Sequence, residues 1–252
     1  MIAPLENLLE MRGIKLQFGD KVILNGVDLC VRSQDVLVIM GLSGCGKSTL
    51  LSIVLGLLKP DAGSVFFKKE ELTELSRWKL NKVRMHIGMV YQNAALLSSL
   101  NVGENVALPL QELTHKTVRE IRSIIDEKLE LVGLSNARDK FPSELSGGMQ
   151  KRAGMARALA LDPELLLFDE PTAGLDPINS DLINELIVTL REKQKVTSVV
   201  VTHEMESAFS LGTRMAFLDE GKMILFGSPD EFRNSEIPIV REFLSPASVH
   251  KK

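Results

Sequence analysis

Residues 41–48 have the composition and spacing of a phosphate-binding loop, G-x-x-x-x-G-K-S. Glycine at positions 41, 44 and 46 allows the backbone to curl so that its N–H groups point at phosphate oxygens. A helix that begins near Lys47 presents the positive end of its dipole to the same anion. Lys47 is expected to reach the β- and γ-phosphates of a nucleotide, and the Ser48 hydroxyl to ligate Mg²⁺. A plain Gly-rich turn is the alternative, but the apolar strand before the loop and the apolar-faced helix after it favour the phosphate site.

Two carboxylates follow a second apolar run. Residues 165–168 predict a strand buried on both faces, and the strand ends in Asp169 and Glu170. If this strand lies next to the strand of the phosphate loop, Asp169 reaches the Mg²⁺ shell. Glu170 would face the opposite way and polarise an attacking water. An acidic turn that closes the strand is the competing interpretation, and it is weak once the phosphate loop is accepted.

A histidine follows a third apolar run. Residues 198–202 lead directly into His203, which the pattern places at the same edge of the predicted sheet. A lone histidine at a strand end is more often a surface or packing residue. Its position here also allows it to contact a γ-phosphate, or to hold the water in line with Glu170.

Strand and helix patterns alternate around these residues, which predicts an α/β fold. Strand patterns cover residues 8–18, 22–31, 36–40, 64–67, 87–91, 165–168 and 196–202, and a hairpin pairs 215–218 with 223–226; helix patterns cover 48–58, 117–132, 149–161, 178–192 and 205–211.

The middle of the chain is the least strand-like part. Residues 117–132 carry a 3.6-period apolar face that stops at Gly133, and residues 149–161 form a second strong helix pattern. The chain is therefore expected to form one domain over residues 1–252, with a helical insertion at approximately 93–158 and a short tail at 245–252.

Composition excludes several classes of protein. Of 252 residues, 44% are hydrophobic and 25% are charged, so the chain has enough apolar surface to fold. The net charge of −3 and a pI near 5.9 argue against a large basic field for nucleic acid. No apolar run approaches the roughly 18 residues of a spanning helix, and the first eleven residues lack the basic start of a signal peptide. Two cysteines, Cys30 and Cys45, are too few for a disulfide framework and favour a reducing compartment.

Several further motifs, taken in order, resemble those of the ABC ATPases. The segment from Leu145 to Gln150, LSGGMQ, is similar to the family's LSGGQ signature, and residues 169–176, DEPTAGLD, look like its Walker B strand running into the D-loop. Gln92 falls where the family has its Q-loop glutamine, His203 where it has its switch histidine, and Phe18 where it has an aromatic residue that stacks on adenine.

The resemblance implies a P-loop NTPase fold, with a RecA-like core, an antiparallel β subdomain and an inserted helical signature subdomain. It also implies that two ATPase subunits sandwich two ATP molecules, each pocket taking Ser146 and Gly148 from the partner copy, with Asp176 along the dimer seam. A plain helix cap at Ser146 is compatible with that role. The implied catalytic residues are Glu170, His203, Lys47 and Gln92, the implied Mg²⁺ ligands are Ser48, Gln92 and Asp169, and the implied nucleotide contacts are Phe18, Gly41, Ser43, Gly44, Cys45, Gly46, Lys47, Ser48, Thr49, Ser146, Gly147, Gly148 and Asp176.

One departure from the commonest signature points to a subgroup. Met149 stands where most relatives have glutamine. This resembles the LSGGM variant of the signature in the ATPases of the lipid-trafficking Mla and Mce-associated transporters. Residues 103–110, 149–157 and 239–244 resemble the same subgroup. This implies an ATPase at the cytoplasmic face of the inner membrane that drives a permease for phospholipid. A lipid-binding Mce-type protein and a small regulatory subunit would be further partners, with no nucleic acid. Residues after Gln92 (Leu96, Leu97, Leu100, Val102) either line a groove for a permease helix or pack within the helical subdomain.

Other classes fit less well. Transporters of amino acids, lipoproteins or other solutes share the same catalytic motifs and stay open. A non-transport ABC ATPase acting on DNA or ribosomes would carry a long coiled coil, tandem cassettes or a basic stripe, and none is present. A small-molecule P-loop kinase leaves the signature and His203 unexplained.

Overall fold

The computed structural model describes residues 6–245, and they divide into two compact units. One unit combines the chain up to Leu80 with the chain from Thr197, and the other runs from Asn81 to Val196. Residues 1–5 lie outside the described range, and so do residues 246–252, which make up nearly all of the tail expected at 245–252.

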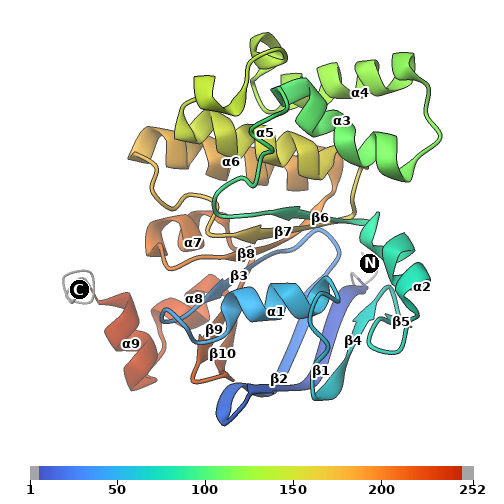
Figure 1. The fold of residues 1–252 in the computed structure, drawn as a ribbon. Helices are drawn as coiled ribbons and strands as arrows, with labels where there is room; N and C mark the ends of the chain where they lie inside the picture. The colour runs from blue at the N-terminus through green and yellow to red at the C-terminus, as the bar shows by residue number, and fades with distance from the viewer. Residues whose placement is uncertain (1–5, 246–252) are drawn as a thin grey trace, which may run out of the picture. The chain divides into compact units, whose positions relative to one another are not determined.

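An antiparallel sheet occupies the N-terminal part of the first unit (Figure 1). Its strands are β1 (Asn7–Phe18), β2 (Lys21–Arg32), β4 (Ala62–Phe67) and β5 (Glu70–Glu71), in the order β2-β1-β4-β5. The turn at Gly19 and Asp20 joins β1 to β2, as the sequence predicts, with Phe18 opposite Lys21. This is the antiparallel β subdomain that the resemblance implies.

A second set of strands in the same unit carries the phosphate loop. β3 (Val36–Met40) pairs in parallel with β8 (Thr197–Val201) on one side and β9 (Arg214–Asp219) on the other, and β9 forms an antiparallel hairpin with β10 (Lys222–Gly227). All residues of β3 and β8 are buried, because neighbours cover both faces of an inner parallel strand. The predicted hairpin and the apolar runs are confirmed.

The helices of the first unit are mostly short. They are α1 (Lys47–Val54), α7 (Met205–Leu211), α8 (Pro229–Arg233) and α9 (Pro238–Leu244), while α2 (Arg77–Arg84) spans the boundary of the two units. The pattern predicts α1 as far as residue 58, which is too long: Leu55 caps the helix and Gly56 then takes a left-handed φ of 63°. The sequence did not predict α2, α8 and α9, since short helices carry too little periodicity to stand out.

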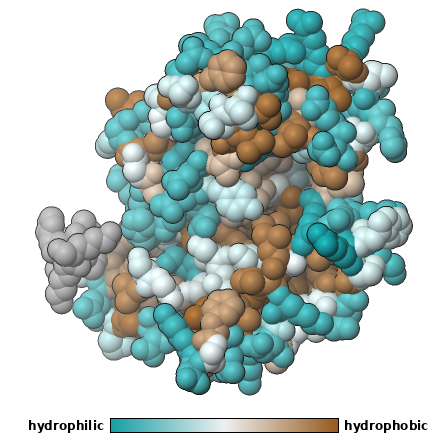
Figure 2. Space-filling model, in the orientation of Figure 1, coloured by the Kyte–Doolittle hydropathy of each residue, from teal (hydrophilic) through white to brown (hydrophobic). Residues whose placement is uncertain are grey.

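The second unit contains two parallel strands and four long helices. β6 (Ile87–Val90) pairs with β7 (Leu165–Asp169), and the helices are α3 (Val102–Leu113), α4 (Val118–Leu131), α5 (Gly147–Leu159) and α6 (Pro177–Gln194), with short 3₁₀ turns at Ser135–Ala137 and Pro142–Glu144. Thr117 and Glu120 form a capping box that starts α4, close to the predicted boundary. Hydrophilic side chains cover much of the visible surface of this unit, with apolar patches between them (Figure 2).

A buried asparagine organises the loop that precedes α3. Asn105 is completely buried, and its side-chain oxygen accepts from the Leu97 backbone N–H at 2.8 Å. Its amide donates to the carbonyls of Leu97, Leu100 and Asn101 at 3.0–3.1 Å. The hydrogen-bonding groups of the Asn105 side chain are thus satisfied by the backbone of the loop before α3.

We expect Asn105→Leu to lower the free energy of unfolding by about 1–3 kcal/mol, since an apolar side chain removes the hydrogen bonds that Asn105 makes to the Leu97 N–H and the Leu100 carbonyl. Chemical denaturation followed by circular dichroism measures this. Asn101→Ala, which removes only the capping box of α3, is expected to cost about 1 kcal/mol. An Asn105 variant as stable as the wild type would contradict the role.

Among the helices within residues 6–245, none combines the length and the apolar character that crossing a membrane requires.

Candidate functional site

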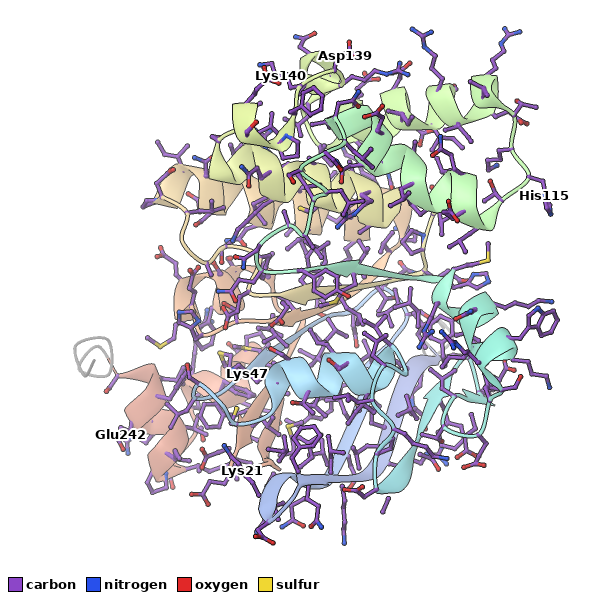
Figure 3. The ribbon with its side chains drawn as sticks, in the orientation of Figure 1. Lys21, Lys47, His115, Asp139, Lys140 and Glu242 are labelled. Carbon is purple, nitrogen blue, oxygen red and sulfur yellow. The ribbon has the colours of Figure 1, made fainter. Side chains whose placement is uncertain are left out.

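The phosphate loop joins the carboxyl end of β3 to the first turn of α1. Gly41, Gly44 and Gly46 all have positive φ, at 147°, 80° and 107°, so the loop uses conformations that glycine alone adopts without strain. Lys47 is the first residue of α1 and is almost fully buried (Figure 3). Its ammonium donates to the carbonyl oxygens of Gly41 at 2.8 Å and Leu42 at 3.0 Å. The Lys47 ammonium is thus held at the inside of the loop by the loop's own carbonyl oxygens.

Close packing also requires the first glycine. A Cβ at Gly41 would overlap the Leu218 carbonyl oxygen of β9 and lie 2.9 Å from Cys45 Sγ. Cys45 fills the inside of the loop: it is buried, burial raises the pKa of its thiol, and its Sγ is 3.8 Å from Lys47 Nζ. A raised pKa keeps the thiol protonated near neutral pH, which fits a loop filler rather than a reactive thiolate.

His203 lies near the phosphate loop in the same unit. β3 and β8 are parallel and in register, with Ile39 opposite Val201, so both strands end at one edge. The Thr202 N–H donates to the Ile39 carbonyl at 3.2 Å, which brings the start of the β8–α7 loop next to the end of β3. His203 and the remaining predicted contacts on this unit are at least partly open to solvent; they are Phe18, Ser43, Gly44, Ser48 and Thr49.

The second unit carries the two carboxylates. Asp169 is the last residue of β7 and is half-buried. Glu170 is also half-buried, but it lies outside the strand with a left-handed φ of 50°. The alternation of side chains along β7 therefore does not set the direction of the Glu170 side chain, because the strand ends at Asp169. The turn that follows β7 decides where Glu170 points.

A side chain of α5 forms hydrogen bonds to the loop that follows Gln92. Gln92 follows β6 by two residues and is exposed, and Ala94 and Ala95 have left-handed φ values of 57° and 48°. The Arg157 guanidinium donates to the carbonyls of Ala95 at 2.7 Å and Ala94 at 2.9 Å. Burial lowers the pKa of Arg157, but a guanidinium stays charged at any physiological pH. Arg157 therefore holds this loop in shape.

The signature residues begin α5. Ser146 is the N-cap, and its hydroxyl accepts from the Met149 N–H at 3.3 Å, so the helix-cap interpretation is correct. Ser146 and Gly147 are exposed, whereas Gly148 is buried. A Cβ at Gly148 would lie 2.6 Å from Asn179 Oδ1, so a larger residue here would force the Asn179 side chain to shift.

Asp176 caps the next helix. Its carboxylate accepts from the Asn179 N–H at 3.0 Å and from the Asn179 amide at 2.6 Å. The side-chain hydrogen bond from Asn179 is the main reason that the pKa of Asp176 lies below its usual value. Asp176 is thus ionised at neutral pH and starts α6.

The residues that suggested a lipid-transport subgroup have structural partners. Met149 is half-buried in the first turn of α5. In α9, Val240 is buried and Phe243 packs edge-on against Phe217, with ring centroids 5.0 Å apart. Packing within this chain therefore accounts for Val240 and Phe243 of α9.

The sequence did not single out three residues that shape the site loops: Asn105, Lys151 and Arg157. Each lies in a helix and donates to a backbone carbonyl in another segment: Asn105 to Leu100, Lys151 to Ala173 and Arg157 to Ala95. Neither spacing nor residue type therefore revealed these roles. The only signal is a polar or charged residue on the buried face of a helix pattern.

Known proteins resemble this chain along nearly all its length. Residues 24–173 match the ABC transporter family. The intermembrane phospholipid transport system ATP-binding protein MlaF of Haemophilus influenzae is 40% identical over 96% of this chain and 92% of its own. The mkl protein of Mycobacterium leprae, named a "probable ribonucleotide transport ATP-binding protein", is 39% identical over 96% of this chain and 70% of its own. A dimeric ATP-binding cassette, MJ0796, solved in a post-hydrolysis state with ADP and Pi, aligns with a TM-score of 0.80 and 33% identity over 87% of this chain and 98% of its own.

Proposed function

Because this chain belongs to the ABC transporter family and is the ATP-binding, ATP-hydrolysing subunit of a transporter, we propose that it drives the movement of phospholipid between membranes. The observation that carries the proposal is the end-to-end match to MlaF, whose length the alignment covers to 92%. The catalytic motifs alone would not distinguish a lipid from another solute, since they serve ATP rather than the cargo. The name of mkl makes a ribonucleotide the alternative cargo.

In the proposed site, the phosphate loop binds the triphosphate and Phe18 stacks on the adenine. Ser43, Gly44, Cys45, Gly46 and Thr49 supply backbone or hydroxyl contacts, and Lys47 leaves the carbonyls of Gly41 and Leu42 for the phosphates. The positive φ values of the three glycines support this proposal, because they turn the loop back on itself at the start of α1.

The donor set fits magnesium. Ser48, Gln92 and Asp169 offer hydroxyl, amide and carboxylate oxygens, and the one carboxylate suits an ion that keeps several waters and binds substrate phosphates. When bound, Mg²⁺ would neutralise charge on the phosphates. The hydrolytic step then uses this chain's own groups: Glu170 accepts a proton from the attacking water, and His203 and Gln92 orient that water and the γ-phosphate.

Two copies of the chain would complete the site. We place Ser146, Gly147 and Gly148 of one copy against the nucleotide of the other, with Asp176 at the seam. The dimeric relative and the exposure of Ser146 and Gly147 support this arrangement. A helix N-terminus capped by serine is well suited to face phosphate.

The other proposed partners are a membrane permease, a lipid-binding Mce-type protein and a small regulatory subunit, which would hold the chain at the cytoplasmic face of the inner membrane. Residues 93–158 form the proposed helical subdomain that receives the permease. Of the suggested groove residues, Leu97 is exposed and suits docking, whereas Val102 is fully buried and serves packing.

The cargo proposal is tested by reconstituting the chain with its permease in liposomes. We expect ATP-dependent transfer of fluorescent phospholipid between donor and acceptor vesicles, and stimulation of ATP hydrolysis by phospholipid. Glu170→Gln in the same complex is the matched control and should abolish transfer. Stimulation and transport by a ribonucleotide or an amino acid, with no lipid transfer, would refute the proposal.

A further inference from the structure

A buried lysine lies one turn beyond the signature glycines. Lys151 is in α5 and is 7% exposed, and lysine is rarely buried to this extent unless its ammonium is paired. Its ammonium donates to the Ala173 carbonyl at 2.6 Å and reaches the Glu170 carbonyl at 3.4 Å. Both carbonyls belong to the turn that follows β7, on a different part of the same unit. Lys151 thus joins the signature helix to the backbone of Glu170.

The turn that Lys151 contacts is conformationally demanding. Glu170 has a left-handed φ of 50°, a conformation that costs a residue with a Cβ about 1–2 kcal/mol. The Ala173 N–H donates back to the Glu170 carbonyl at 3.3 Å, and the Leu175 N–H to the Thr172 carbonyl at 3.1 Å, so the backbone folds tightly over residues 170–175. The carbonyls of Glu170 and Ala173 converge on one ammonium. A charged donor stabilises such a convergence better than a neutral one.

Other contacts also join the start of α5 to this turn and to the helix that follows it. Gly148 packs against Asn179, and Gly147 lies against Leu175, with a Cβ-to-Cδ2 distance of 3.7 Å for a built side chain. Asn179 in turn donates to Asp176. Lys151 adds a charged contact between α5 and the turn that follows β7.

We propose that Lys151 is a positioning residue for hydrolysis, which holds the Glu170 turn in the geometry that aims its carboxylate at the attacking water. It acts through the backbone of Glu170 and Ala173 and touches neither nucleotide nor water. Through α5, the same ammonium links the position of the signature end to the direction of Glu170 in the same chain. The inference rests on the proposed role of Glu170 as the general base.

The test is a double-mutant cycle in the assembled transporter. Lys151→Met keeps the length of the side chain and removes its donors. We expect kcat for ATP hydrolysis to fall on the order of 10- to 100-fold, the scale of a misplaced catalytic group, with KM and ATP affinity unchanged. In the Glu170→Gln background, single-turnover hydrolysis should show no further loss from Lys151→Met, because the group it positions is already disabled.

A matched control lies on the same helix. Arg152 donates to the carbonyls of Val132 and Gly133 at 3.0 and 3.2 Å, away from the Glu170 turn. Arg152→Gln removes a cation from α5 and should leave kcat near that of the wild type. If Lys151→Met does not fold, Lys151→Gln, which keeps a neutral donor, replaces it in the cycle.

The outcomes distinguish the positioning role of Lys151 from the proposed role of Glu170 as the general base. Glu170→Gln with wild-type turnover contradicts the assignment of the base. A slow Glu170→Gln with a fully active Lys151→Met contradicts the positioning role alone. Equal losses from Lys151→Met in both backgrounds, or the same loss from Arg152→Gln, would show a general structural effect and overturn the inference.

Discussion

Replacing Glu170 with glutamine is expected to slow ATP hydrolysis by a factor on the order of 10²–10⁴ while leaving ATP binding intact. Glutamine has nearly the same shape but does not accept a proton from water at neutral pH, and general-base catalysis contributes a factor of this size. The left-handed turn at Glu170 and its half-buried position should be preserved, because the backbone contacts to Lys151 do not involve the substituted atoms.

The variant should also accumulate as an ATP-bound dimer, since hydrolysis is what would release the nucleotide from between two copies. Steady-state phosphate release and size-exclusion chromatography with and without ATP measure both effects. Glu185→Gln is the matched control, because it removes an exposed carboxylate from α6. Unchanged turnover by Glu170→Gln in the assembled transporter would assign the base to another residue.

Replacing Lys47 with alanine is expected to weaken ATP binding on the order of 10²-fold. The variant loses charge-assisted hydrogen bonds to two phosphate groups, each worth about 1.5–3 kcal/mol, and part of that energy is offset because wild-type Lys47 gives up its bonds to Gly41 and Leu42. A fluorescent ATP analogue titrated in the absence of hydrolysis measures the dissociation constant.

The control for Lys47 is a lysine of the same unit with no expected contact to phosphate. Lys21 begins β2 and is exposed, so Lys21→Ala changes the net charge equally and should leave ATP affinity unaltered (Figure 3). Thermal unfolding must show that Lys47→Ala is folded. Wild-type affinity in a folded Lys47→Ala protein would remove the lysine from the phosphate site.

Local sequence determined those parts of the site that depend on neighbours along the chain. The loop from Gly41 to Ser48, the cap at Ser146 and the alternation of strands and helices follow from glycine spacing, capping chemistry and apolar periodicity, all of which act over a few residues. The α/β fold class was accordingly predictable from these patterns, and the family from the resemblance of the ordered motifs to those of the ABC ATPases; the structure and the relatives confirm both.

Tertiary contacts decided the rest. Asn105, Lys151 and Arg157 bind backbone carbonyls in other segments, and these partners exist only once the second unit has folded. The direction of Glu170 belongs to the same class, because strand alternation ends at Asp169 and a turn tied to α5 takes over. A one-dimensional pattern records which residue types lie near one another in the chain. It does not record which buried cation will bind which distant carbonyl. In this protein, the hydrogen bonds from Lys151 to the carbonyls of Glu170 and Ala173 lie in the turn that carries the proposed base.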